Sequence, residues 1–125
     1  MKTRITVLLI LLMVLLGAAA ASDTLTLTFV GDISIGDAIS LRGHQSSFHS
    51  VVLEKGTDWP FSLVKDTLLE DDLTVANLEG SITTRRKHKD ILYPLVIAPE
   101  FTEILKVGGI DVVNTANNHA LDFLA

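Results

Sequence analysis

Three short apolar segments of this chain are each followed immediately by a cluster of polar residues. The apolar segments cover 25–30, 73–76 and 110–113, and the polar clusters cover 31–37, 77–80 and 114–119. Stretches with helical spacing of apolar residues lie between them. This alternation predicts an α/β fold with parallel strands. Because ligands bind beyond the carboxyl ends of parallel strands, the three clusters are expected to converge on one edge of the sheet.

Two amphipathic helices are expected between the strands. Apolar residues recur at helical spacing in 60–69, and Pro99 stands where a first helical residue is favoured. The pair Gly108-Gly109 is expected to end the second helix. The segment 91–98 is expected to hold an edge strand at best, because Pro94 lacks the N–H that a central strand needs.

The first 21 residues have the features of a secretory signal. Lys2 and Arg4 precede a long run of Leu, Val and Ile, which ends in small residues. Cleavage after Ala20 or Ala21 would fit this pattern. An uncleaved anchor is the alternative, although the run is at the short limit for a membrane span. We therefore expect residues 1–21 to direct export and residues 22–125 to belong to one domain.

The composition disfavours one class of partner and restricts the residues that could form a metal site. No cysteine occurs, so no disulfide stabilises the fold, and any metal site must use Asp, Glu, His or Asn. The chain has 10 Lys and Arg against 15 Asp and Glu, a balance that disfavours nucleic acid as a partner. One basic run occupies 85–89, and it is either a solvated loop or an anion contact near the site.

The first two polar clusters contain carboxylates suited to a hard cation. Gly31 allows a tight turn that would leave Asp32 at the sheet edge. Asn77 and Glu79 are two residues apart, so in an extended segment they point to the same side. Carboxylates of this kind can bind or bridge divalent cations. Taken singly, Asp32 also suits a turn and Glu79 a solvent-facing position.

The third cluster combines amides, an imidazole and a carboxylate. The side-chain carbonyl of Asn118 is a suitable metal ligand, and His119 can donate a proton to a departing oxygen. Asp122 is placed to orient the ring through its other nitrogen. The alternative is that Asn118 and His119 cap a helix beginning near Ala120.

Three motifs carry a resemblance to a known family. The strings FVGDISIGD, ANLEGSIT and IDVVNTANNHALDF resemble the first three motifs of the CapA-type poly-γ-glutamate capsule biosynthesis family, in the same order. That family is similar to the calcineurin-like metallophosphoesterases. The resemblance covers roughly 25–123 and implies that 22–125 is the N-terminal part of a metallophosphoesterase-like α/β sandwich.

The resemblance also implies roles for individual residues. Asp32 matches a ligand of one metal, Glu79 the bridging carboxylate, and Asn118 the amide ligand of a second metal. His119 matches the histidine that stabilises or protonates the departing oxygen. The implied cofactors are two divalent cations, with manganese, zinc and iron left open. They would activate a water and stabilise charge on a phosphoryl centre.

The resemblance implies that the chain takes part in making, exporting or anchoring the anionic polymer poly-γ-glutamate, and the signal-like residues 1–21 imply that it is exported. An anionic polymer or a phosphoester is the implied substrate, and membrane-associated capsule export proteins are the implied partners. The family's later histidines would follow further strands, so we interpret the chain as truncated and expect it to fold poorly.

Two alternatives to the enzymatic interpretation stay open. A non-catalytic component of capsule assembly would carry the same export signal and acidic charge. A Gly-Asp-Ser type ester hydrolase is disfavoured, because Ile33 separates Asp32 from Ser34.

Overall fold

A computed structural model describes residues 24–123 of the chain. The predicted signal or anchor segment, 1–21, lies outside the described residues. Within the described part, no helix has both the length and the apolar character needed to cross a membrane.

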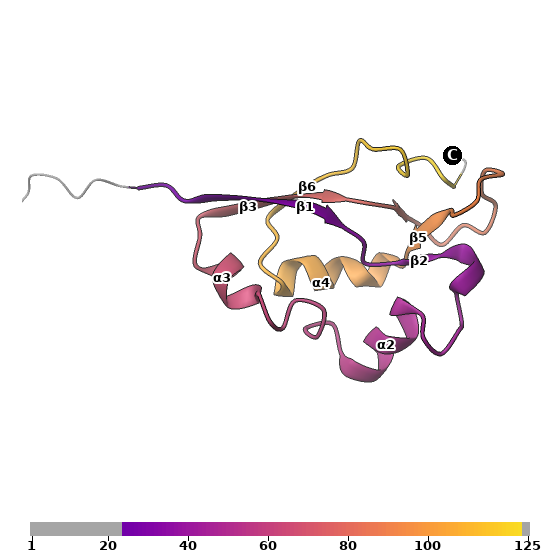
Figure 1. The fold of residues 1–125 in the computed structure, drawn as a ribbon, viewed down its shortest axis with the longest axis horizontal. Coiled ribbons are helices and arrows are strands. Elements are labelled where there is room, and N and C mark those ends of the chain that lie inside the picture. Colours follow the sequence, from indigo (N-terminus) through magenta and orange to yellow (C-terminus); the bar gives the residue numbers. More distant parts are fainter. Residues whose placement is uncertain (1–23, 124–125) are drawn as a thin grey trace, which may run out of the picture.

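A parallel sheet of three strands forms the centre of the fold. The strands are β1 (Leu27–Ile33), β3 (Leu73–Leu78) and β6 (Val112–Asn114), in the spatial order β1-β3-β6. Both neighbouring pairs are parallel, so the chain crosses over between strands on the way (Figure 1). The predicted α/β class with parallel strands is confirmed.

The strands continue into the polar clusters that were expected to follow them. Strand β1 includes Asp32 and β3 includes Asn77. A register irregularity lies between Phe29 and Asp32, where Gly31 was expected to make a turn. Strand pairing uses backbone groups, so a strand does not stop where its side chains become polar.

A second, smaller sheet packs beyond the end of β3. It has the order β2 (Asp37–Ala38), β5 (Leu95–Ile97), β4 (Ser81–Ile82). Since β5 pairs with both neighbours, the expectation that 91–98 holds only an edge strand is wrong. Pro94 lies immediately before β5, where its missing N–H removes no ladder bond. Its carbonyl accepts a hydrogen bond from the Ile39 N–H at 2.9 Å.

The helices match the sequence pattern only in part. The second predicted helix is confirmed as η2 (Pro99–Phe101) and α4 (Thr102–Val107), which Gly108 follows. The first is shorter than predicted, because α3 covers only Lys65–Leu69 and turns precede it. The 3-10 turn η1 (Ile39–Leu41) and helix α2 (Phe48–Lys55) were not predicted.

Helix α2 begins at a cap made by two separate segments. The Ser47 side chain accepts a hydrogen bond from the Ser50 N–H at 3.1 Å. The Asp37 carboxylate accepts from the N–H groups of Phe48 and His49 at 2.7 and 3.0 Å. A carboxylate at a helix N-terminus satisfies unpaired N–H groups and complements the helix dipole. The second Gly-Asp pair of the first cluster therefore has a structural role.

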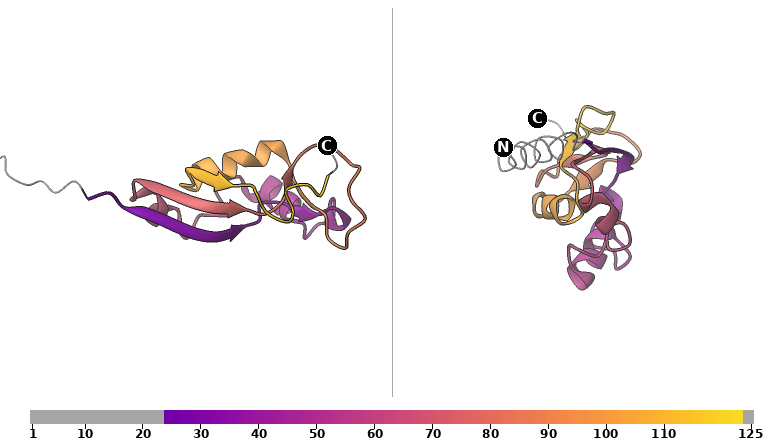
Figure 2. Two further views of the ribbon diagram at one scale, coloured as in Figure 1. Left: turned by 90° about the horizontal axis from the view of Figure 1, so that it is seen from above. Right: turned by 90° about the vertical axis from the view of Figure 1, so that its left-hand side faces the viewer.

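The hydrophobic core lies on one face of the parallel sheet. Figures 1 and 2 show the helices gathered on that face. Thr74, Ala76 and Leu78 of β3 are buried there, with apolar partners from the helices and the second sheet. On the opposite face no described helix covers the strands, and Phe29 is 71% and Val112 46% exposed. The sheet thus has a packed face and an open face.

Candidate functional site

A row of polar side chains crosses the open face at the carboxyl end of the parallel sheet. Asp32 and Asn77 are register partners on β1 and β3, and Asn77 and Asn114 are partners on β3 and β6. Side chains that are partners in register project from the same face. The parallel pairing therefore brings the first polar cluster to the second and third, as the sequence predicted.

Asn77 is the centre of this row. Its amide nitrogen donates to Asp32 Oδ1 at 2.9 Å and to Glu79 Oε1 at 3.1 Å. Its side-chain oxygen accepts from the amides of Asn114 and Asn117 at 3.0 and 3.1 Å. Two donors and two acceptor positions are all that an asparagine side chain offers. Every one is used, so the orientation of the Asn77 amide is fixed by its partners.

The Glu79 carboxylate is only half satisfied. Its Oε1 accepts from Asn77, whereas Oε2 is buried and has no hydrogen-bond partner in the described part of the chain. A buried carboxylate oxygen without a partner is costly unless a proton or a cation satisfies it. Asp32 is exposed beside it and shares the same Asn77 amide. These two carboxylates fit a hard divalent cation.

A complete ligand set does not appear in the described residues. Within 24–123, no group of three or more His, Cys, Asp and Glu side chains has the arrangement of a metal site. Asn118 is exposed, and its side chain forms no hydrogen bond with the described residues. The amide that reaches the row is Asn117. The assignment of Asn118 as a ligand stays a prediction.

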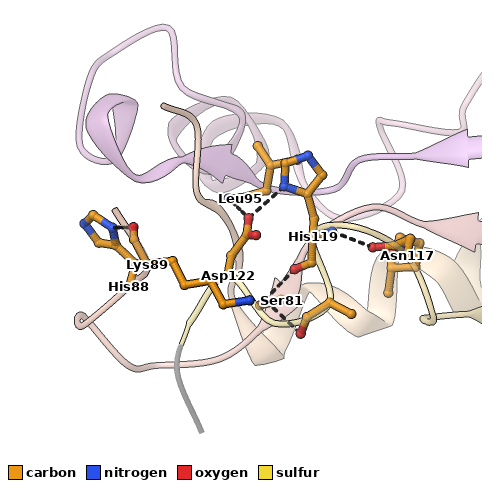
Figure 3. A network of polar contacts seen from close by, with 9 residues as sticks. Ser81, His88, Lys89, Leu95, Asn117, His119 and Asp122 are labelled. Atoms are coloured by element: carbon orange, nitrogen blue, oxygen red, sulfur yellow. Dashed lines mark hydrogen bonds and ion pairs between the residues drawn. The ribbon is translucent and has the colours of Figure 1, made fainter. Parts of the chain in front are cut away.

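Asn117 connects the polar row to the turn that follows β6. Its side-chain nitrogen also donates to the Leu78 carbonyl at 2.8 Å, and its oxygen accepts from the His119 N–H at 3.0 Å. Figure 3 shows this contact between Asn117 and His119. The helix considered near Ala120 does not form, because residues 118–121 make a turn.

His119 and Asp122 form a tightly held pair. His119 Nδ1 lies 2.7 Å from Asp122 Oδ2, which also accepts from the Leu95 N–H at 2.8 Å (Figure 3). This contact engages Nδ1 of the ring and leaves Nε2 for other partners. Asp122 is 1% exposed, so the carboxylate that contacts the ring is itself held in a buried position. The contact expected between the two is present, and the catalytic role of each remains a prediction.

Two backbone contacts hold the turn that carries this pair. The buried Ser81 hydroxyl donates to the His119 carbonyl at 2.8 Å (Figure 3). The Lys89 N–H donates to the Asp122 carbonyl at 2.7 Å. The sequence analysis did not single out Ser81. Ser81 directly follows the second polar cluster in the sequence, but its contact with a residue 38 positions later cannot be inferred from spacing.

Most of the described chain matches the sequence model of a known protein family. The family model described as bacterial capsule synthesis protein PGA_cap matches residues 26–125, which include the polar row and the His119–Asp122 pair. The chain belongs to this family. The resemblance of the three motifs to the CapA-type capsule biosynthesis family is thereby confirmed.

Two curated relatives agree with the family. The chain is 30% identical over 105 residues to the PGA biosynthesis protein CapA of Bacillus subtilis (strain 168), covering 82% of this chain and 25% of that protein. It is 29% identical over 106 residues to the capsule biosynthesis protein CapA of Bacillus anthracis, covering 82% and 24%. The chain thus spans about a quarter of the length of the curated relatives it matches. No solved structure matches it.

Proposed function

We propose that this chain is the part of an exported capsule biosynthesis protein that supplies the carboxylates of a divalent-metal, phosphoesterase-type site. The names of both relatives support a role in capsule biosynthesis, poly-γ-glutamate in the first case. The signal-like sequence of residues 1–21 supports export. Membrane-associated proteins of the same process would be its partners.

The observation that carries this proposal is the unpaired oxygen of Glu79. Glu79 Oε2 is buried without a partner, and Oε1 shares the Asn77 amide with Asp32. Asp32 and Glu79 would hold the cation, with Asn118 as the third proposed ligand. A bound divalent cation supplies an activated water and neutralises charge on a phosphoryl group.

The chain's own proton donor in this scheme is His119. Its Nδ1 is engaged by Asp122, so proton exchange with a departing oxygen falls to Nε2. The His119 side chain is 23% exposed, so it is partly accessible from solvent. The Asn117 side chain contacts both Asn77 and the His119 N–H, so it connects the backbone of His119 to the row that contains the carboxylates.

A metal titration tests the proposal. We expect the purified chain to bind Mn²⁺ in calorimetry, and we expect Glu79→Gln and Asp32→Asn each to weaken binding by about tenfold or more, since each removes a charged ligand. The matched control is Glu54→Gln, a charge loss at an exposed position of α2. Unchanged Mn²⁺ affinity in Glu79→Gln would contradict the proposed site.

A second candidate function is a non-catalytic component of capsule assembly. The specific observation behind it is the open sheet face, where Phe29 and Val112 are exposed. Contiguous exposed apolar surface is typical of protein-binding sites. The two functions are distinguished by Glu79→Gln, which removes a metal-dependent activity and leaves a pure assembly role intact.

A further inference from the structure

Positive charge is concentrated in one part of this acidic protein. Five of the eight Lys and Arg residues within 24–123 are Arg42, Arg85, Arg86, Lys87 and Lys89. Four of them belong to the segment 83–94, here called the basic loop, in which Asp90 is the only acidic residue. The basic loop follows β4 and returns to the chain at β5. From the sequence, this run of basic residues suits either a solvated loop or an anion contact.

Two of these arginines meet at one cavity although they are far apart in sequence. Arg42, directly after η1, and Arg86 line a cavity of about 360 Å³ together with Ile39. Guanidinium groups have fixed donor geometry that suits carboxylate and phosphate oxygens. A cavity lined by two arginines is suited to an anionic group.

A second cavity lies between the basic loop and the turn after β6. Its volume is about 600 Å³, and its lining includes Arg85, the hydroxyl residues Thr83 and Thr115, and Phe123. Ser81, which holds the His119 carbonyl, also lines it. The basic loop thus has one arginine-lined cavity beside η1 and another beside the candidate site.

The basic loop is fixed to the candidate site by contacts along its length. Its start is held by the Thr83 N–H, which donates to the Ile97 carbonyl at 3.1 Å. Further along, the backbone N–H of Lys89 donates a hydrogen bond to the Asp122 carbonyl. The His88 ring lies edge-on to Phe123, with ring centroids 5.9 Å apart. Figure 3 shows His88 and Lys89 next to Asp122. The backbone of the basic loop is therefore held next to the turn that carries His119 and Asp122.

Most of these charges are not neutralised by the protein. Arg42, Arg86, Lys87 and Lys89 form no ion pair with any acidic side chain of residues 24–123. A cluster of like charges without counter-charges repels itself and attracts anions. A ligand with several negative groups would satisfy more of these charges than a small anion, which fits only one cavity.

We propose that the basic loop and Arg42 bind an extended polyanion with repeated carboxylates, which runs from the Arg42–Arg86 cavity to the Arg85 cavity beside His119. This inference deepens the proposed function, because it gives the anionic polymer a binding surface next to the candidate site. It does not require that Glu79 hold a metal. Binding by several exposed charges weakens steeply as the salt concentration rises.

An anionic membrane is the competing ligand for this surface. Ile91, Leu92 and Tyr93 of the basic loop are 40%, 80% and 61% exposed, and apolar residues beside basic ones are typical of membrane-binding segments. The arginine-lined cavities favour the polymer, because a flat bilayer surface contacts protruding side chains rather than hollows.

Fluorescence anisotropy with a labelled oligoglutamate, long enough to span both cavities, tests the proposal on the purified full chain. We expect salt-sensitive binding that the double variant Arg42→Gln/Arg86→Gln weakens by about tenfold or more, as a loss of two charge-assisted contacts predicts. The matched control, Lys55→Gln/Lys106→Gln, removes two charges elsewhere and is expected to bind as the parent does. Circular dichroism of each variant confirms that its fold is unchanged.

Three results would overturn the inference. The first is oligoglutamate affinity that Arg42→Gln/Arg86→Gln leaves unchanged. The second is displacement of the oligomer by inorganic phosphate or monomeric glutamate at equal charge concentration, which would mean a small-anion subsite only. The third is tighter binding to anionic phospholipid vesicles that Leu92→Ser abolishes. Glu79→Gln is expected to retain oligoglutamate binding, so failure of the metal site and failure of this surface are distinguishable.

Discussion

Asn77 uses all of its hydrogen-bonding capacity to hold the candidate site together. It contacts both carboxylates through its nitrogen and both neighbouring amides through its oxygen. Without it, Asp32 and Glu79 would face each other with no shared donor. At the scale of single residues, Asn77 therefore acts as a positioning residue.

Replacing Asn77 should destabilise the carboxyl end of β3, the middle strand of the parallel sheet. We expect Asn77→Ala to lower the free energy of local opening of β3 by about 1–3 kcal/mol, because it removes four hydrogen bonds, two of them to the part-buried side chains of Glu79 and Asn117. Hydrogen exchange of the β3 amides measures this. Asn118→Ala is the matched control, since the Asn118 side chain is exposed and forms no hydrogen bond with residues 24–123. Equal protection in both variants would refute the positioning role.

The second glycine of the first motif is required by close packing between elements. A Cβ placed on Gly36 would lie 2.2 Å from the Val96 carbonyl oxygen of β5, a distance that forces backbone movement. A Cβ on Gly31 would meet nothing within 4 Å. The two glycines therefore differ in their tolerance of a side chain, although they occupy similar places in the motif.

This difference gives a prediction at the scale of the second sheet. Gly36→Ala should disrupt the pairing of β2 with β5 and destabilise the protein by about 1–3 kcal/mol, the usual cost of overpacking. Gly31→Ala should change stability by less than about 0.5 kcal/mol, as surface substitutions usually do. Hydrogen exchange at Val96 and the far-ultraviolet circular dichroism of both variants provide the measurement. Loss of protection in Gly31→Ala alone would show that the packing argument is wrong.

The elements that could be predicted are those marked by a pattern within their own stretch of sequence. The period-two pattern and the polar clusters located β1, β3 and β6, and Pro99 and Gly108 bounded the second helix. Helix α2 escaped prediction because part of its cap, Asp37, lies 11 residues before the N–H group it accepts from. In the same way, the hydrogen bonds of Asn77 to Asp32 and Asn114 could not be predicted, because they depend on the register between strands.

At the scale of the whole molecule, the open sheet face is the dominant feature. Leu27 and Phe29 of β1 are 46% and 71% exposed, and Val112 of β6 is 46% exposed. Val75 lies between Phe29 and Val112 in register, so these side chains form a continuous apolar surface beside the polar row. Burial of such surface is the main stabilising contribution in folding, and here one face of the sheet lacks it.

The open face should make the isolated chain associate and bind hydrophobic dyes. We expect strong fluorescence with anilinonaphthalene sulfonate, a broad thermal transition and concentration-dependent sedimentation, because exposed apolar surface promotes association. The double variant Leu27→Thr/Phe29→Thr should reduce dye binding and association while keeping the strand, since threonine suits β-structure. Leu63→Thr is the control, because Leu63 is 98% exposed and lies outside the sheet. A sharp, cooperative melt of a monomeric parent chain without dye binding would mean that the covered face alone stabilises the fold.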